Sequence, residues 1–161
     1  MLDKAKFIPG LKLSEMFYEE AVKPILDSEF PDLTYSAALL GSGSEVLGFD
    51  TPQSMDHHWG PRIQLFLSDE DYKKYKGSIS SVMSKKLPYT FHEIPTNFGS
   101  ADEIGVQMLV EKTDGEINHR VSIETIKSFY ESNLAINPYG EISIEDWLTF
   151  PEQHLLIASN K

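Results

Sequence analysis

The chain has 161 residues, 40% of them hydrophobic, and this length and composition predict a single folded domain spanning residues 1–161. The formal net charge of −11 argues against nucleic acid as a partner, because phosphate contacts are made mainly by Lys and Arg. The absence of cysteine excludes disulfides and thiolate metal sites. No stretch approaches the ~20 apolar residues of a membrane span, and no signal-like apolar region precedes Leu13, so we expect a cytoplasmic protein without a membrane partner.

The first third of the chain predicts a helix followed by a strand. Ser14 and the apolar residues at helical spacing after it predict a helix that ends near Phe30. Pro24 should kink this helix unless the preceding turn adjusts. The segment from Tyr35 to Leu40 is almost entirely apolar and predicts a central strand.

The remainder predicts short elements in mixed order. We expect a short helix at 45–48, a loop at 50–54, a strand at 63–67, a helix at 69–87 capped by Ser68, an extended segment at 89–94, a loop at 95–103, strands at 106–111 and 118–123, a helix from Glu124 to about Leu134, a short helix after Ser143 and a last helix at 154–158. This mixture favours an α/β or α+β fold with a small mixed β-sheet flanked by helices.

Candidate functional residues lie between the first two predicted strands. The turn Gly41-Ser42-Gly43-Ser44 directly follows the first strand. Glycine reaches positive φ at low cost, and successive free N–H groups in such a turn can bind a phosphate. Asp56, just before the second strand, could then hold the cation that accompanies the phosphates. A simple tight turn is the alternative for the glycines, and a capping cluster or a transition-metal site is the alternative for Asp56-His57-His58.

Three stretches, GSGSEVLGFD, SMDHHWGPRIQLFL and DWLTFPEQHLL, resemble a bacterial family of unknown function within the nucleotidyltransferase superfamily, whose fold polymerase beta shares. The resemblance implies transfer of a nucleoside monophosphate from a nucleoside triphosphate to a hydroxyl acceptor, with Mg²⁺ or Mn²⁺ as cofactor. It implies that Gly41, Ser42, Gly43, Ser44 and Arg62 bind the nucleotide, that Asp56 and His58 occupy the metal and catalytic positions, and that Glu124 provides a third catalytic acid.

The chain departs from the family pattern in two places. His58 stands where family members usually have an acidic residue, and imidazole is a poor ligand for magnesium, so we expect weak or absent magnesium-dependent transfer. The chain also lacks the helical second half that is usual in the family. Both departures favour the alternative of a non-catalytic nucleotide-binding, regulatory or protein-interaction module. An apolar face left by the early end could be covered by a protein partner or a second copy.

Two further assignments stay open at the level of sequence. Ser122, rather than Glu124, could occupy the position of the third acid on the strand at 118–123. Arg62 could form a structural salt bridge instead of reaching a phosphate.

Overall fold

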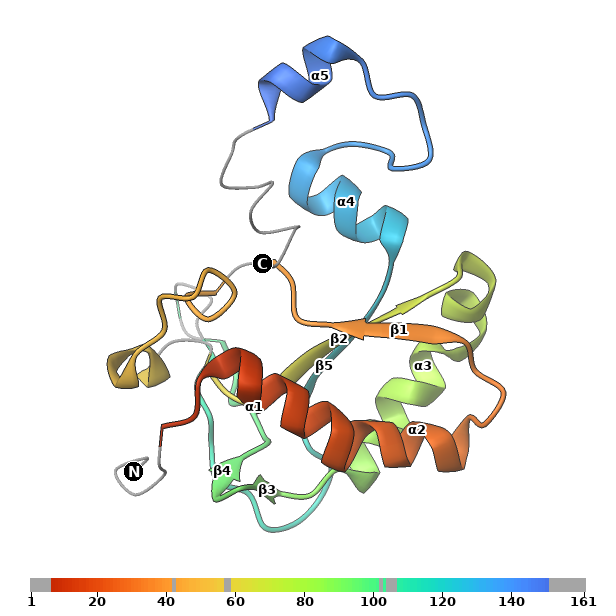
Figure 1. The fold of residues 1–161 in the computed structure, drawn as a ribbon. Coiled ribbons are helices and arrows are strands. Elements are labelled where there is room, and N and C mark those ends of the chain that lie inside the picture. Colours follow the sequence, from red (N-terminus) through yellow and green to blue (C-terminus); the bar gives the residue numbers. More distant parts are fainter. Residues whose placement is uncertain (1–6, 42, 57–58, 102, 104–106, 151–161) are drawn as a thin grey trace.

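The computed structural model describes residues 7–41, 43–56, 59–101, 103 and 107–150, with the backbone alone for Ser54 and Asp56. Its elements, in order, are α1 (Gly10–Phe17), the π-helical turn η1 (Tyr18–Val22), α2 (Lys23–Glu29), β1 (Tyr35–Ala38), the 3₁₀ turn η2 (Pro52–Asp56), β2 (Arg62–Leu67), α3 (Asp69–Lys86), β3 (Thr90–Phe91), β4 (Ile94–Pro95), β5 (Arg120–Thr125), α4 (Ile126–Leu134) and α5 (Ile144–Thr149). The predicted mixture of helices with a small mixed sheet is confirmed (Figure 1).

The main sheet has three strands in the order β1-β2-β5. β1 pairs with β2 in antiparallel orientation, with Ala38 opposite Gln64. β2 pairs with β5 in parallel orientation, with Gln64 opposite Ser122. The prediction that the first strand is central is therefore wrong, because β1 lies at the edge and ends at Ala38. Small side chains such as alanine do not require burial on both faces of a sheet, so an apolar run of this kind is compatible with an edge strand.

One face of the sheet forms the hydrophobic core. In β2 and β5 alternate residues are buried, because successive side chains of a strand point to opposite faces. Helices α1, α2 and α3 cover this face (Figure 1). The core side chains that these helices and strands bring together include Leu13, Phe17, Leu26, Ile63, Leu65, Ile79, Met83, Val121 and Ile123.

The opposite face of the sheet is largely polar. The alternation in β2 and β5 gives this face the side chains of Arg62, Gln64, Phe66, Arg120, Ser122 and Glu124. Helix α4 lies on this side of the sheet (Figure 1), and Phe129 meets Phe66 edge to face with ring centroids 5.5 Å apart. The polar side chains nearer the starts of β2 and β5 line a pocket.

The N-terminal helix differs from its prediction at its start. α1 begins at Gly10, whose N–H donates to Asp50 Oδ2 at 2.6 Å. Ser14 is not the cap, because it is buried within α1 and its hydroxyl donates to the Arg62 carbonyl at 2.7 Å. Pro24 lies in the first turn of α2, directly after the π-helical turn, so the preceding turn does adjust to the proline.

Capping side chains define the later helices. The Ser68 side chain accepts from the Asp71 N–H at the start of α3, as predicted. Strand β5 continues to Thr125, so the prediction that the helix starts at Glu124 is wrong. Thr125 and Ser128 form a capping box that starts α4. Ser143 and Asp146 form the predicted capping box of α5, which exposes Ile144, Trp147 and Leu148.

Other predictions need correction or lie outside the described residues. Residues 45–48 form hydrogen-bonded turns instead of a helix. The segment at 89–94 is part of the β3-β4 hairpin, which turns at His92 and Glu93 with positive φ. Within 107–111 there is only an isolated bridge between Leu109 and Phe98. The last predicted helix, 154–158, falls outside the described residues. Among the residues that are described, no helix has the length and hydrophobicity to span a membrane.

Candidate functional site

The glycine-rich turn lies where β1 ends and β2 begins. Because β1 and β2 are antiparallel, the residues after Ala38 lie beside the first residues of β2. Gly41 has φ = 93° and Gly43 has φ = 146°, conformations that side chains of L-residues disfavour. The expectation that this turn needs glycine for its backbone conformation is confirmed at both positions. Ser42 lies outside the described residues.

Gly43 approaches an ion pair. A Cβ atom at this position would overlap Arg62 Nη2 and the carboxylate of Glu45. The Arg62 guanidinium pairs with Glu45 Oε1, and the two side chains are 19% and 7% exposed. The salt bridge that the sequence left open for Arg62 is therefore present. It also fixes the ion pair beside the turn, where the Arg62 guanidinium and the Glu45 carboxylate both face Gly43.

Gln64 connects the turn to Glu124. The Leu40 N–H donates to Gln64 Oε1 at 2.7 Å, and a Cβ atom at Gly41 would lie 3.9 Å from Gln64 Nε2. Burial raises the pKa of Glu124, whereas hydrogen bonds from the side chains of Ser122 and Gln64 lower it. Glu124 is thus partly buried and hydrogen-bonded on the polar face of the sheet. It contacts the residue that supports the turn.

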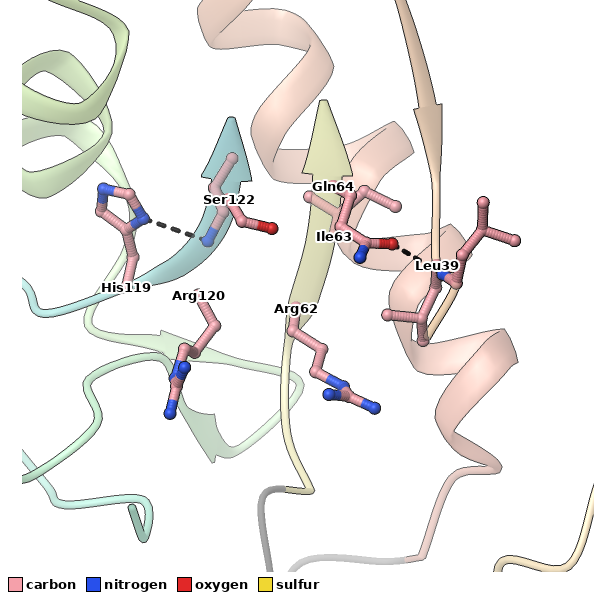
Figure 2. Close-up of a pocket in the computed structure, with 9 residues that line it drawn as sticks. Leu39, Arg62, Ile63, Gln64, His119, Arg120 and Ser122 are labelled. Carbon is pink, nitrogen blue, oxygen red and sulfur yellow. Dashed lines mark hydrogen bonds between the residues drawn. The ribbon is translucent and has the colours of Figure 1, made fainter. Parts of the chain in front are cut away.

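A pocket of about 230 Å³ opens at the starts of β2 and β5. The side chains of Arg62 and Arg120 leave the starts of these strands, and their guanidinium ends point away from each other (Figure 2). Hydrogen bonds drawn in Figure 2 join Gln64 to Leu40 and His119 to the backbone of β5. The pocket is lined by Leu39, Leu40, Arg62, Ile63, Gln64, His119, Arg120, Val121 and Ser122.

His119 has a structural position in the pocket wall. Its Nδ1 accepts from the Val121 N–H at 3.1 Å, and its Nε2 lies 3.1 Å from the Ser80 carbonyl. This pattern assigns a neutral ring with the proton on Nε2. Burial lowers the pKa of His119, and the hydrogen bond to Ser80 opposes that shift. Both ring nitrogens are engaged, so His119 positions the start of β5.

The structure places the remaining predicted residues as follows. Asp56 ends the 3₁₀ turn η2, six residues before the first residue of β2. His57 and His58 lie outside the described residues. Ser44 lies in the turn, and its carbonyl accepts from the Phe49 N–H at 2.8 Å. Among the described residues, Gly41, Gly43, Arg62 and Glu124 are thus gathered around Gln64 and the start of β2.

Gln64 and Arg120 are lining residues with functional side chains that the sequence analysis did not single out. Both alternate with apolar residues in predicted strands, and that alternation is the signal that marks them as belonging to the face opposite the core. Arg120 is also one of only two arginines in the chain, the other being Arg62. Their proximity depends on which strands pair, and the sequence pattern does not specify this pairing.

Comparison of the chain with protein-family models, with curated proteins and with solved structures finds no match. The class that the geometry supports is an α+β domain with a mixed sheet, a glycine turn after its edge strand and a polar pocket at the start of two parallel strands.

Proposed function

We propose that the chain is a nucleotidyltransferase-like protein that binds the phosphates of a nucleoside triphosphate beside the Gly41–Ser44 turn. The observation that supports this most is the place of the turn, which has two positive-φ glycines, lies beside Gln64 of β2 and brings Gly43 against the Arg62 guanidinium. A turn of this kind presents backbone N–H groups, which suit phosphate oxygens, and the guanidinium beside it is held in place by Glu45. The resemblance of GSGSEVLGFD to the nucleotidyltransferase superfamily leads to the same ligand.

The reaction of this class would transfer a nucleoside monophosphate to a hydroxyl acceptor. Mg²⁺ or Mn²⁺ would neutralise the phosphates and activate the attacking oxygen. Among the described residues, no three His, Cys, Asp or Glu side chains gather as a metal site. The described residues do not by themselves form a cation site, so metal binding would depend on Asp56 and His58. Because imidazole replaces a carboxylate at His58, we propose that Mn²⁺ supports binding better than Mg²⁺ and that magnesium-dependent transfer is weak or absent.

The second candidate is a binding module of the same fold without catalysis. The position of Glu124 favours it: Ser122 and Gln64 hydrogen-bond this carboxyl group, and burial raises its pKa, which disfavours the charged form that a cation ligand requires. Such a module would hold the nucleotide in the same place and lack the carboxylates that transfer needs.

Calorimetric titration with ATP and GTP tests the proposal, in Mg²⁺ and in Mn²⁺ separately. The set of proteins is the parent chain, Asp56→Ala and His58→Asp, with Asp114→Ala as a control at an exposed turn. We expect saturable binding by the parent chain that Asp56→Ala weakens and that Asp114→Ala leaves unchanged. Magnesium-dependent binding gained by His58→Asp would indicate a pocket that has lost one ligand.

The outcomes separate the two candidates. Nucleotide binding that needs no metal, with the same affinity in Asp56→Ala and His58→Asp as in the parent chain, would favour the binding module over the enzyme. Heats of injection no larger than the heats of dilution, for every protein and both nucleotides, would contradict nucleotide binding altogether.

A further inference from the structure

The only two arginines of the chain lie opposite each other. Arg62 starts β2 and Arg120 starts β5, and the parallel pairing places them in register. Both line the same pocket, and their side chains extend to the same side of the sheet (Figure 2). The charge of Arg62 contributes to lowering the pKa of Arg120, so the two guanidinium groups influence each other electrostatically. In a chain with a net charge of −11, the parallel pairing of β2 and β5 thus brings its only two arginines to one pocket.

The two guanidinium groups differ in their partners. Arg62 pairs with the buried carboxylate of Glu45. The Arg120 side chain donates from Nη2 to Gln107 Oε1, and its guanidinium carbon lies 5.3 Å from the centre of the Phe98 ring. Gln107 and Phe98 carry no charge. In the described part of the chain, no carboxylate pairs with Arg120, so its charge is held in place by neutral groups.

We propose that Arg120 is the anion-binding residue of this pocket and that the anion is a phosphate group. Guanidinium donors are arranged in a planar fork that matches two phosphate oxygens, and Gln107 and Phe98 hold the fork in one orientation. Arg62, whose charge is paired with Glu45, forms the opposite wall of the pocket. Burial and the charge of Arg62 both lower the pKa of Arg120, and a bound anion would oppose these effects.

The size of the pocket favours phosphate over a whole nucleoside. Pockets for drug-sized ligands enclose roughly 300–1,000 Å³, whereas this one encloses about 230 Å³. A phosphate chain fits this volume, and a base and sugar would extend beyond it. The inference rests on the proposed function in that the pocket borders the glycine turn through Leu40 and Arg62, although the anion site can be tested without a nucleotide.

The experiment titrates inorganic tripolyphosphate into the parent chain and two variants. Arg120→Gln removes the guanidinium, and Lys127→Gln removes one positive charge from an exposed position on α4. We expect saturable binding by the parent chain, at least tenfold weaker binding by Arg120→Gln, and a change of less than twofold for Lys127→Gln. Equal affinity of the parent chain and Arg120→Gln, or no binding by the parent chain, would overturn the proposal.

A spectroscopic measurement keeps the test valid if Arg120→Gln does not fold. The chain has two arginine Nε–H groups, so a ¹⁵N-labelled sample gives two such signals, which are assigned through their bonded side-chain carbons. Tripolyphosphate should shift the Arg120 signal more than the Arg62 signal. Shifts confined to Arg62, or to neither arginine, would contradict the assignment of the anion to Arg120.

ATP provides the arm that separates this inference from the proposed function. Suppose that tripolyphosphate binding needs Arg120 and that ATP binds no more tightly than tripolyphosphate. This result would support the phosphate site and contradict a nucleotide as its ligand. ATP binding that is unaffected by Arg120→Gln would support the proposed nucleotide binding and contradict Arg120 as the anion-binding residue.

Discussion

The carboxylate of Glu45 pairs with the guanidinium of Arg62, and both side chains are largely removed from solvent. Glu45 lies in the turn after the glycines and Arg62 starts β2, so the pair connects the glycine turn to the sheet. Replacing Glu45 by Gln leaves the Arg62 charge without this partner, and we expect a loss of about 1–3 kcal/mol in the free energy of unfolding. Denaturant titration measures it. Glu29→Gln, which breaks an exposed pair with Lys86, is the matched control and should cost less than about 1 kcal/mol. Equal costs for the two variants would contradict a structural role for the buried pair.

Gly43 is expected to tolerate no side chain. Its φ of 146° strains an L-residue, and a Cβ atom would overlap Arg62 and Glu45. Gly43→Ala should therefore lower the free energy of unfolding by about 1–3 kcal/mol. Gly77→Ala is the control, because a Cβ atom in that part of α3 meets nothing within 4 Å, and it should stabilise the helix by about 0.5–1 kcal/mol. Thermal unfolding followed by circular dichroism compares the two; a Gly43→Ala protein as stable as the parent would disprove the close approach.

His119 predicts a loss of stability in mild acid. Its folded-state pKa is lowered, so near the usual histidine pKa of 6.5 the unfolded chain binds more protons than the folded chain. The contribution of His119 to the free energy of unfolding is fully present above pH 6.5 and is lost as the pH falls below this value. We expect the unfolding free energies of the parent chain and His119→Gln to differ more at pH 7.5 than at pH 5.5. Denaturant titrations at both pH values measure this, and parallel pH curves for the two proteins would refute it.

Glu124 predicts a pH dependence of stability opposite to that of His119. Its folded-state pKa is raised by burial, so the folded chain holds the proton at pH values where the unfolded chain has released it. Its contribution to stability therefore falls as the pH rises through the ordinary carboxyl pKa, and it remains unfavourable at neutral pH. We expect Glu124→Gln to raise the unfolding temperature at pH 7. The variant should also lose less stability than the parent chain as the pH rises. Glu131→Gln, an exposed carboxylate of α4, should change stability by less than about 0.5 kcal/mol. A lower unfolding temperature for Glu124→Gln would indicate that the charged form is favoured in the folded protein.

Local sequence determined most of the secondary structure. The Ser68 cap and the acidic residues after it fix the start of α3, and Ser143 with Asp146 fixes the start of α5. The glycine requirement of the turn at 41–43 is also local, because it depends on backbone conformation at single residues. These features could be predicted since their determinants lie within a few residues of each other.

Tertiary structure decided the pairing of distant elements. β1 became an edge strand because β2 pairs with both β1 and β5, and no local pattern in β1 specifies that arrangement. The same pairing places Arg120 opposite Arg62, and the packing of the glycine turn against β2 places Glu45 beside Arg62. Sequence alone could therefore identify some residues of the candidate site, namely Gly41, Gly43 and Arg62, but not Gln64 and Arg120. Which of them meet at the pocket depended on strand register, because register is set by the burial of side chains from the whole sheet and its helices.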